Sequence, residues 1–157
     1  MCKLFPVYIN SSLLAKSIPL LIRYGEIIFS ENENPVAVFI EGLEKGLTRA
    51  IAAVNNNDDV IGIVVFYDFT YLSDEKFVCY MYGAGKRGVA TVLEQAFKVI
   101  FDSLKLQGCL AVRFETKKYN MPMRFMARRM GFRKVGKLCG YMKNGSIGEN
   151  ILYEKIL

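Results

Sequence analysis

The segment GAGKRGVATVLEQAF, residues 83–97, joins a glycine-rich basic turn to the start of an apolar-striped helix. Such a turn leaves several backbone N–H groups without partners at the helix start, and glycine lets a ligand approach them closely. The helix dipole adds partial positive charge there, and Lys86 and Arg87 add full charges. These features predict an anion site suited to a pyrophosphate. Because neither a P-loop nor a Rossmann fingerprint is present, a turn that binds nothing stays an open alternative.

Several other kinds of chemistry are excluded by composition. The chain has no histidine, which removes every Ser-His or Cys-His mechanism. Its four cysteines (Cys2, Cys79, Cys109 and Cys139) form no C-x-x-C pair, so we expect no metal site and reduced thiols in a reducing compartment. No apolar run approaches the ~20 residues that span a bilayer, and no signal-peptide pattern is present. We therefore expect a cytoplasmic protein without membrane contact.

Positive charge is concentrated in one part of the chain. Residues 113–143 hold ten lysines and arginines against a single acid, Glu115, whereas the whole chain carries a net charge of +6. A localised basic segment indicates an anionic partner, which would be the phosphates of a cofactor, a nucleic acid or an acidic protein surface. A solvated basic face without a partner is the alternative.

The elements that position these residues follow from periodicity and turn signals. The order is helices, a hairpin, a strand, a helix, a strand, a helix and a final hairpin, all in one domain over residues 1–157. This order predicts an α/β (α+β) fold with one mixed sheet of six or seven strands and helices on both faces. Pro19 should kink or divide the first helix, and Asn120 should cap the last one.

The best-supported element is the helix predicted over residues 87–107, which would pack on the sheet. Its apolar residues recur at i, i+3, i+4 and i+7, and they are Val89, Val92, Leu93, Ala96, Phe97, Ile100, Phe101 and Leu104. Strands predicted on either side, at residues 75–83 and 109–116, should run parallel to each other. The glycine turn therefore lies where a strand of the sheet enters this helix.

With these elements in place, the chain resembles the GNAT family of N-acetyltransferases from about residue 36 to its end. The family turn Q/R-x-x-G-x-G/A is matched by GKRGVA at Gly88 and Ala90, although Gly85 replaces the first glutamine or arginine. A later family motif is matched by NMPMRFMARRMGF, which supplies Asn120, Gly131 and Phe132 at the family spacing.

The resemblance implies a mechanism and a ligand. Acetyl-CoA or CoA would lie between two splayed strands, its pyrophosphate on the turn, and an amine would attack the thioester directly. The residues implied to hold it are Gly85, Lys86, Arg87, Gly88, Val89, Ala90 and Asn120. The implied acid, usually a tyrosine, would reprotonate the departing thiolate.

The position of that tyrosine, seven after Asn120, is Ala127, and a methyl group donates no proton. Tyr80, Tyr82 or Tyr141 could substitute as the catalytic acid, although each could equally be a packing aromatic. We therefore expect an acyl-CoA-dependent N-acyltransferase that is slow or atypical. Restoring the phenol by Ala127→Tyr should then raise the rate.

Two other functions stay open from the sequence alone. The first is a catalytically silent GNAT-fold binding or assembly factor, of the kind used in phage head assembly, which would be virion-associated if phage-encoded. The second is a nucleic-acid-binding module that uses the basic segment 113–143. Fold alone does not decide among these functions.

Overall fold

The computed structural model describes residues 2–28, 34–86, 90–141 and 147–157, with side chains except those of 24–28, 35, 90–93, 140–141 and 147. Its helices are α1 (Ser12–Ile28), α2 (Pro35–Glu44), α3 (Ala90–Leu106) and α4 (Met121–Arg129). Its strands are β1 (Lys3–Val7), β2 (Thr48–Val54), β3 (Val60–Ser73), β4 (Lys76–Gly85), β5 (Cys109–Lys117), β6 (Arg133–Tyr141) and β7 (Ile147–Ile156).

The strands form one mixed sheet in the order β1-β2-β3-β4-β5-β7-β6. β4 and β5 run parallel, as expected for a strand–helix–strand unit, and the other neighbouring pairs in the described residues are antiparallel. β7 lies between β5 and β6, so the last hairpin folds back to place its second strand inside the sheet. The predicted mixed sheet is therefore confirmed.

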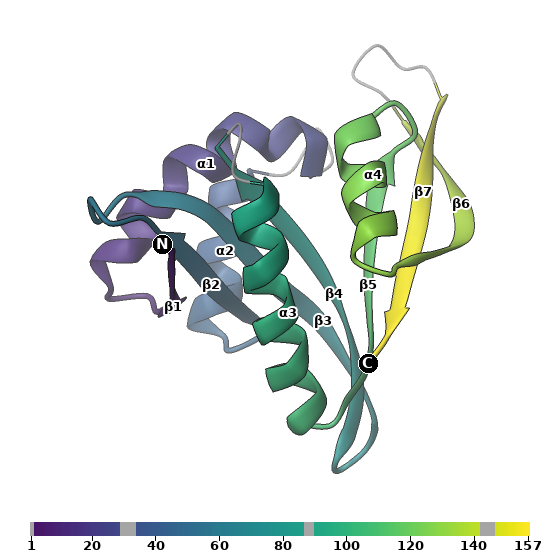
Figure 1. The fold of residues 1–157 in the computed structure, drawn as a ribbon, viewed down its shortest axis with the longest axis horizontal. Helices are drawn as coiled ribbons and strands as arrows, with labels where there is room; N and C mark the ends of the chain where they lie inside the picture. The colour runs from purple at the N-terminus through teal and green to yellow at the C-terminus, as the bar shows by residue number, and fades with distance from the viewer. Residues whose placement is uncertain (1, 29–33, 87–89, 142–146) are drawn as a thin grey trace.

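Helices cover both faces of the sheet, with α1 and α2 on one face and α3 and α4 on the other (Figure 1). Each face has its own apolar core. The core under α3 and α4 includes Phe66, Phe77, Phe97, Phe114 and Phe132. The core under α1 and α2 is built mainly from aliphatic side chains, together with Phe39: Val7, Leu14, Leu20, Leu21, Val54, Val60, Ile63 and Val65.

The described part of α3 buries the stripe that the sequence predicted. Ala96, Phe97, Ile100, Phe101 and Leu104 are all buried. The helix is followed by Gly108 at φ +92°, and a Cβ there would lie 1.9 Å from the carbonyl oxygen of Glu75. Only glycine fits this position, because both the backbone angle and the contact exclude a side chain.

Two features at the N-terminus differ from the sequence-based expectations. β1 was not predicted as a strand, and it contains Pro6, which has no backbone N–H to donate. β1 lies at the edge of the sheet, where a missing N–H is tolerated. α1 continues through Pro19, so the helix is not divided there, which was one of the two expected outcomes. The strand count of seven includes β1.

An ion-pair network fastens the C-terminal strands to the chain before α4. The two carboxylate oxygens of Glu149 on β7 lie 2.7 Å from Lys118 Nζ and 2.6 Å from Lys137 Nζ on β6. The hydrogen bond from Lys118, followed by that from Lys137, lowers the pKa of Glu149 to about 2. The network therefore depends on an ionised Glu149.

This network predicts a loss of stability in acid. A carboxyl whose pKa is lower in the folded state contributes stability above its unfolded pKa of about 4.5, and loses it as pH falls toward about 2. We expect Glu149→Gln to lower the melting temperature at pH 7 and to show little difference from wild type near pH 2. Circular dichroism melts across this range measure the effect. Glu115→Gln removes an exposed carboxylate of β5 and is the control. Its melting temperature should stay close to that of wild type both at pH 7 and near pH 2.

Candidate functional site

β4 and β5 separate partway along their length. Their parallel register runs from Phe77 opposite Cys109 to Tyr80 opposite Arg113 and stops there in the described residues. β4 continues to Gly85 and β5 to Lys117 without pairing to each other, and Figure 1 shows the two strands diverging. The peptide groups that β4 turns toward β5 beyond Tyr80 therefore face the divergence rather than a sheet neighbour.

Each strand is held on its outer side, which explains the separation. β4 stays in register with β3 as far as Gly85 opposite Gly62. β5 stays in register with β7 as far as Lys117 opposite Asn150. Because both outer ladders are continuous where the inner one ends, the divergence is a fixed part of the sheet.

The glycine-rich turn is shorter than the sequence suggested. Gly83 and Gly85 belong to β4, where they pair with Val64 and Gly62, and the Lys86 N–H donates to the Ile61 carbonyl at 2.8 Å. The two glycines alternate with Tyr82 and Ala84, so they lie on the α3 face of β4 and leave its backbone bare there.

The rest of the predicted anion site is only partly visible. Lys86 is exposed at the end of β4, and Ala90 begins α3. Arg87, Gly88 and Val89 lie outside the described residues, as does the side chain of Ala90. The strand-to-helix connection at this place is as predicted, but its contacts with a ligand stay a prediction.

A row of polar and aromatic residues crosses the sheet where β4 and β5 part. The register aligns Tyr67 with Tyr80, Tyr80 with Arg113, Arg113 with Glu154, and Glu154 with Arg133. Directly opposed residues share a face, so this row lies on the α1/α2 side. Arg113 Nε donates to a Glu154 carboxylate oxygen at 2.6 Å. That hydrogen bond raises the pKa of Arg113, with a smaller contribution from Tyr80.

Two of the three candidate tyrosines lie together. The Tyr67 ring lies 5.9 Å from that of Tyr80 and 5.5 Å from that of Tyr82, measured between centroids. Burial, followed by the neighbouring Tyr67, raises the pKa of Tyr82, so its phenol holds its proton firmly and is a weaker acid. Tyr141 ends the edge strand β6, two strands away from β5, so the fold does not bring it to this group.

Asn120 acts as the N-cap of α4, as predicted. Its side-chain oxygen accepts a hydrogen bond from the Met123 N–H at 3.4 Å, and Pro122 occupies the first turn. One carbonyl oxygen can accept a second bond, so the cap leaves capacity for a ligand. The cap fixes the start of the helix beside the C-terminal end of β5.

Ala127 lies on the inward side of α4, is fully buried, and packs in the same core as Phe114 and Phe132. Its carbonyl accepts the Phe132 N–H at 2.9 Å. The position at which the family resemblance expects a tyrosine is therefore a core position in this chain. This burial undermines the expectation that Ala127→Tyr would restore a catalytic acid.

We expect Ala127→Tyr to destabilise the protein by roughly 1–3 kcal/mol or more, because a phenol must be forced into a packed core. Urea denaturation followed by circular dichroism measures the change. Arg128→Tyr, at the exposed neighbouring position, is the matched control and should stay within about 0.5 kcal/mol of wild type. An Ala127→Tyr protein as stable as wild type would show that this site has space for a phenol.

Cys79 and Cys109 are buried thiols on β4 and β5, with their sulfur atoms 3.9 Å apart. The hydrogen bond to Cys109, followed by burial, raises the pKa of Cys79. A buried protonated thiol is a poor nucleophile, so Cys79 acts as a packing residue where β4 and β5 are still paired. The same hydrogen bond lowers the pKa of Cys109, which is buried in the same core.

Sequence reasoning missed Arg113, Glu154 and Asn150. The Asn150 side-chain oxygen is buried, and no hydrogen-bond partner for it is present among the described residues. Arg113 counted only toward the basic segment, and Glu154 carried no motif. Arg113 lies on β5 and Glu154 lies on β7, and only the register of these two strands brings the two side chains together.

Comparison with solved structures identifies the architecture. An acetyltransferase of the GNAT family from Streptococcus pneumoniae aligns with a TM-score of 0.70 and 12% identity, covering 100% of both chains. Arabidopsis thaliana NAA60 in complex with acetyl-CoA aligns with a TM-score of 0.72 and 20% identity, covering 100% of this chain and 99% of the other. The chain has the GNAT fold.

Other GNAT-fold structures agree. The ribosomal-protein-S5-alanine acetyltransferase of Vibrio fischeri has a TM-score of 0.75 and 15% identity, covering 99% of this chain and 92% of that one. No protein-family model matches the sequence, and no curated protein matches it significantly. The backbone therefore matches the GNAT fold over nearly the whole chain, whereas sequence identity to these structures is low. Among the described helices, none is long and apolar enough to cross a membrane.

Proposed function

We propose that this GNAT-fold protein transfers an acyl group from acetyl-CoA to an amine at the divergence of β4 and β5. The observation that carries the proposal is the end of the β4–β5 register at Tyr80 and Arg113. A strand with one bare edge offers a row of backbone donors and acceptors to an extended, amide-containing ligand. The acetyl-CoA complex of the similar NAA60 structure supports this ligand class.

The chain offers groups for both ends of such a ligand. Lys86 and the turn after Gly85, with Arg87, Gly88, Val89 and Ala90, would hold the pyrophosphate. From Gly85 back to Tyr80, β4 spans about 17 Å of extended strand. Gly83 and Gly85 place no side chain on the α3 face of β4 beside this edge. Asn120, with its spare acceptor capacity, would contact the ligand from the start of α4.

In the proposed reaction the amine nitrogen bonds to the thioester carbon, the C–S bond breaks, and the thiolate departs. We assign the acid to Tyr80, because it is the last residue of β4 that pairs with β5 and it belongs to the row with Arg113 and Glu154. Its phenol would deliver a proton to the departing sulfur. Tyr82 is less suited, because burial raises its pKa. The proton that the amine loses passes to solvent.

The rate is expected to be low on ordinary amines. Ala127, at the position of the family tyrosine, supplies no proton. Proximity alone supplies part of the rate, and a thiolate leaves without full protonation, so transfer does not depend wholly on the acid.

Gly83→Val tests the location of the ligand. A Cβ at Gly83 would meet the Ile63 carbonyl oxygen at 3.4 Å, Phe97 Cζ at 3.9 Å and Val64 Cγ2 at 4.0 Å, which are ordinary contacts for a Cβ. We expect valine there to weaken acetyl-CoA binding at least about tenfold. A tenfold rise in Kd corresponds to a loss of ~1.4 kcal/mol of binding free energy. Calorimetric titration of wild type and variant with acetyl-CoA measures it.

Gly136→Val on β6 is the matched control, because its nearest contact is also ordinary, 3.8 Å from Leu152 Cβ. That variant should bind acetyl-CoA as wild type does. Equal binding by wild type and Gly83→Val would place the ligand elsewhere. If wild type binds acetyl-CoA and transfers acetyl to no amine in a broad panel, the protein is a silent GNAT-fold binding or assembly factor.

A further inference from the structure

The basic segment of the sequence becomes one surface on the α4 side of the sheet. We call it the α4 face, and its exposed cations are Lys118, Arg128, Arg129, Lys134 and Lys137. α4 contributes the arginines. Lys134 and Lys137 of β6 share that side, because the β6–β7 register pairs them with Tyr153 and Ile151, which lie in the core under α4.

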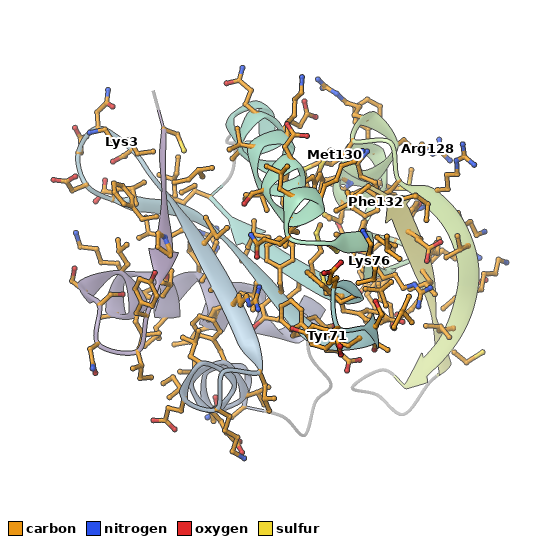
Figure 2. All side chains as sticks on the ribbon, turned by 90° about the horizontal axis from the view of Figure 1, so that it is seen from below. Lys3, Tyr71, Lys76, Arg128, Met130 and Phe132 are labelled. Carbon is orange, nitrogen blue, oxygen red and sulfur yellow. The ribbon has the colours of Figure 1, made fainter. Side chains whose placement is uncertain are left out.

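Acids neutralise only part of this surface. Glu149 pairs with Lys118 and Lys137, and Glu94 of α3 lies 2.9 Å from Arg129. Arg128 and Lys134 are exposed and form no ion pair within the described residues. Figure 2 shows Arg128 projecting outward from α4, whereas Phe132 lies inward. The α4 face therefore presents excess positive charge to solvent.

Aromatic rings are exposed among these cations. Phe125 is 64% exposed in the middle of α4, and Tyr119 is 64% exposed just before the helix. Helical spacing sets Phe125 between Arg128 and Arg129 on the outward side, opposite the buried Ala127. An exposed phenylalanine between two arginines costs solubility, and nothing in the packing of the described residues requires it there.

We propose that the α4 face binds single-stranded nucleic acid, independently of the acyl-transfer site. The arginines and lysines would contact phosphates, and Phe125 and Tyr119 would stack on unpaired bases. A duplex hides the faces of its bases, so the exposed rings would gain nothing from it. An anionic membrane favours a continuous apolar helix face, whereas the exposed apolar residues of α4, Met121 and Phe125, are flanked by Arg128 and Arg129.

The probe is a fluorescein-labelled single strand of mixed sequence, about 15 nucleotides long, as RNA and as DNA. Fluorescence anisotropy at salt concentrations from about 50 to 200 mM gives affinity and salt dependence. We expect Arg128→Gln with Lys134→Gln to weaken binding and to reduce the slope of log K against log salt by roughly 1.4, or ~0.7 for each lost phosphate contact. Lys98→Gln with Lys105→Gln, which removes the same charge from α3, should change the slope little.

Phe125→Ala separates stacking from charge. We expect it to weaken single-strand binding roughly tenfold while leaving the salt slope and any duplex binding unchanged. Circular dichroism confirms that this exposed substitution leaves the fold intact. The proposal is overturned if wild type binds neither RNA nor DNA strands, if the α3 control weakens binding as much as the α4 pair, or if Phe125→Ala has no effect. Preferential, Phe125-dependent binding to vesicles of anionic lipid would also overturn it.

Discussion

Replacing Phe97 by aspartate is expected to unfold the protein. Phe97 is 2% exposed, lies on α3, and stacks on Phe101 with ring centroids 5.7 Å apart. Losing a buried phenylalanine costs about 3–5 kcal/mol, and an unpaired buried carboxylate adds a further penalty. Domains of this kind are stable by only about 5–15 kcal/mol, so the sum removes most or all of the folded state.

Circular dichroism and thermal melts measure the outcome. Val99→Asp is the matched control, because Val99 lies on the same helix and is 62% exposed. It introduces the same charge and should change stability by no more than about 0.5 kcal/mol. A cooperative melt for Phe97→Asp at the wild-type temperature would contradict the packing of α3 on the sheet.

Tyr80→Phe is expected to have the largest effect on chemistry. If Tyr80 returns the proton to the thiolate, its loss should lower kcat for acetyl transfer by ~10²-fold, within the 10²–10⁴ range of general acids. Affinity for acetyl-CoA should not change, because the ring and the backbone of β4 remain. Single-turnover transfer with a reactive amine and calorimetric titration give the two quantities separately.

Tyr82→Phe is the control for this assignment. It removes a hydroxyl from the same strand and the same face, next to the same partner Tyr67. Because the raised pKa of Tyr82 makes it the weaker acid, its loss should change kcat by less than Tyr80→Phe does. Equal small effects from both would remove the catalytic tyrosine from the mechanism, and the thiolate would then leave unprotonated.

Local signals in the sequence predicted most of the fold. The apolar stripe of α3 and the Asn120 cap of α4 depend on neighbours close in the chain, so they can be read without tertiary contacts. β1 was missed because Pro6 argues against a strand unless the strand is at an edge, and edge position is a tertiary property.

The candidate site was predicted less completely than the fold. Motif spacing indicated the strand-to-helix turn and Asn120, because these residues act through local backbone geometry. It also ended the strand at Gly83 and assigned Gly85 to a turn, although pairing with β3 makes Gly85 part of the strand. The burial of Ala127 depends on Phe114 and Phe132 packing around it, so the sequence offered no warning against adding a phenol.

The sequence by itself determined which elements form, and it located the basic charge in residues 113–143. Tertiary structure decided where the strands separate and which side chains meet there. Tyr80, Arg113 and Glu154 are distant in the chain and become neighbours only through the registers of β4 with β5 and β5 with β7. Strand register is set by side-chain packing over the whole sheet, and no short stretch of residues contains that information.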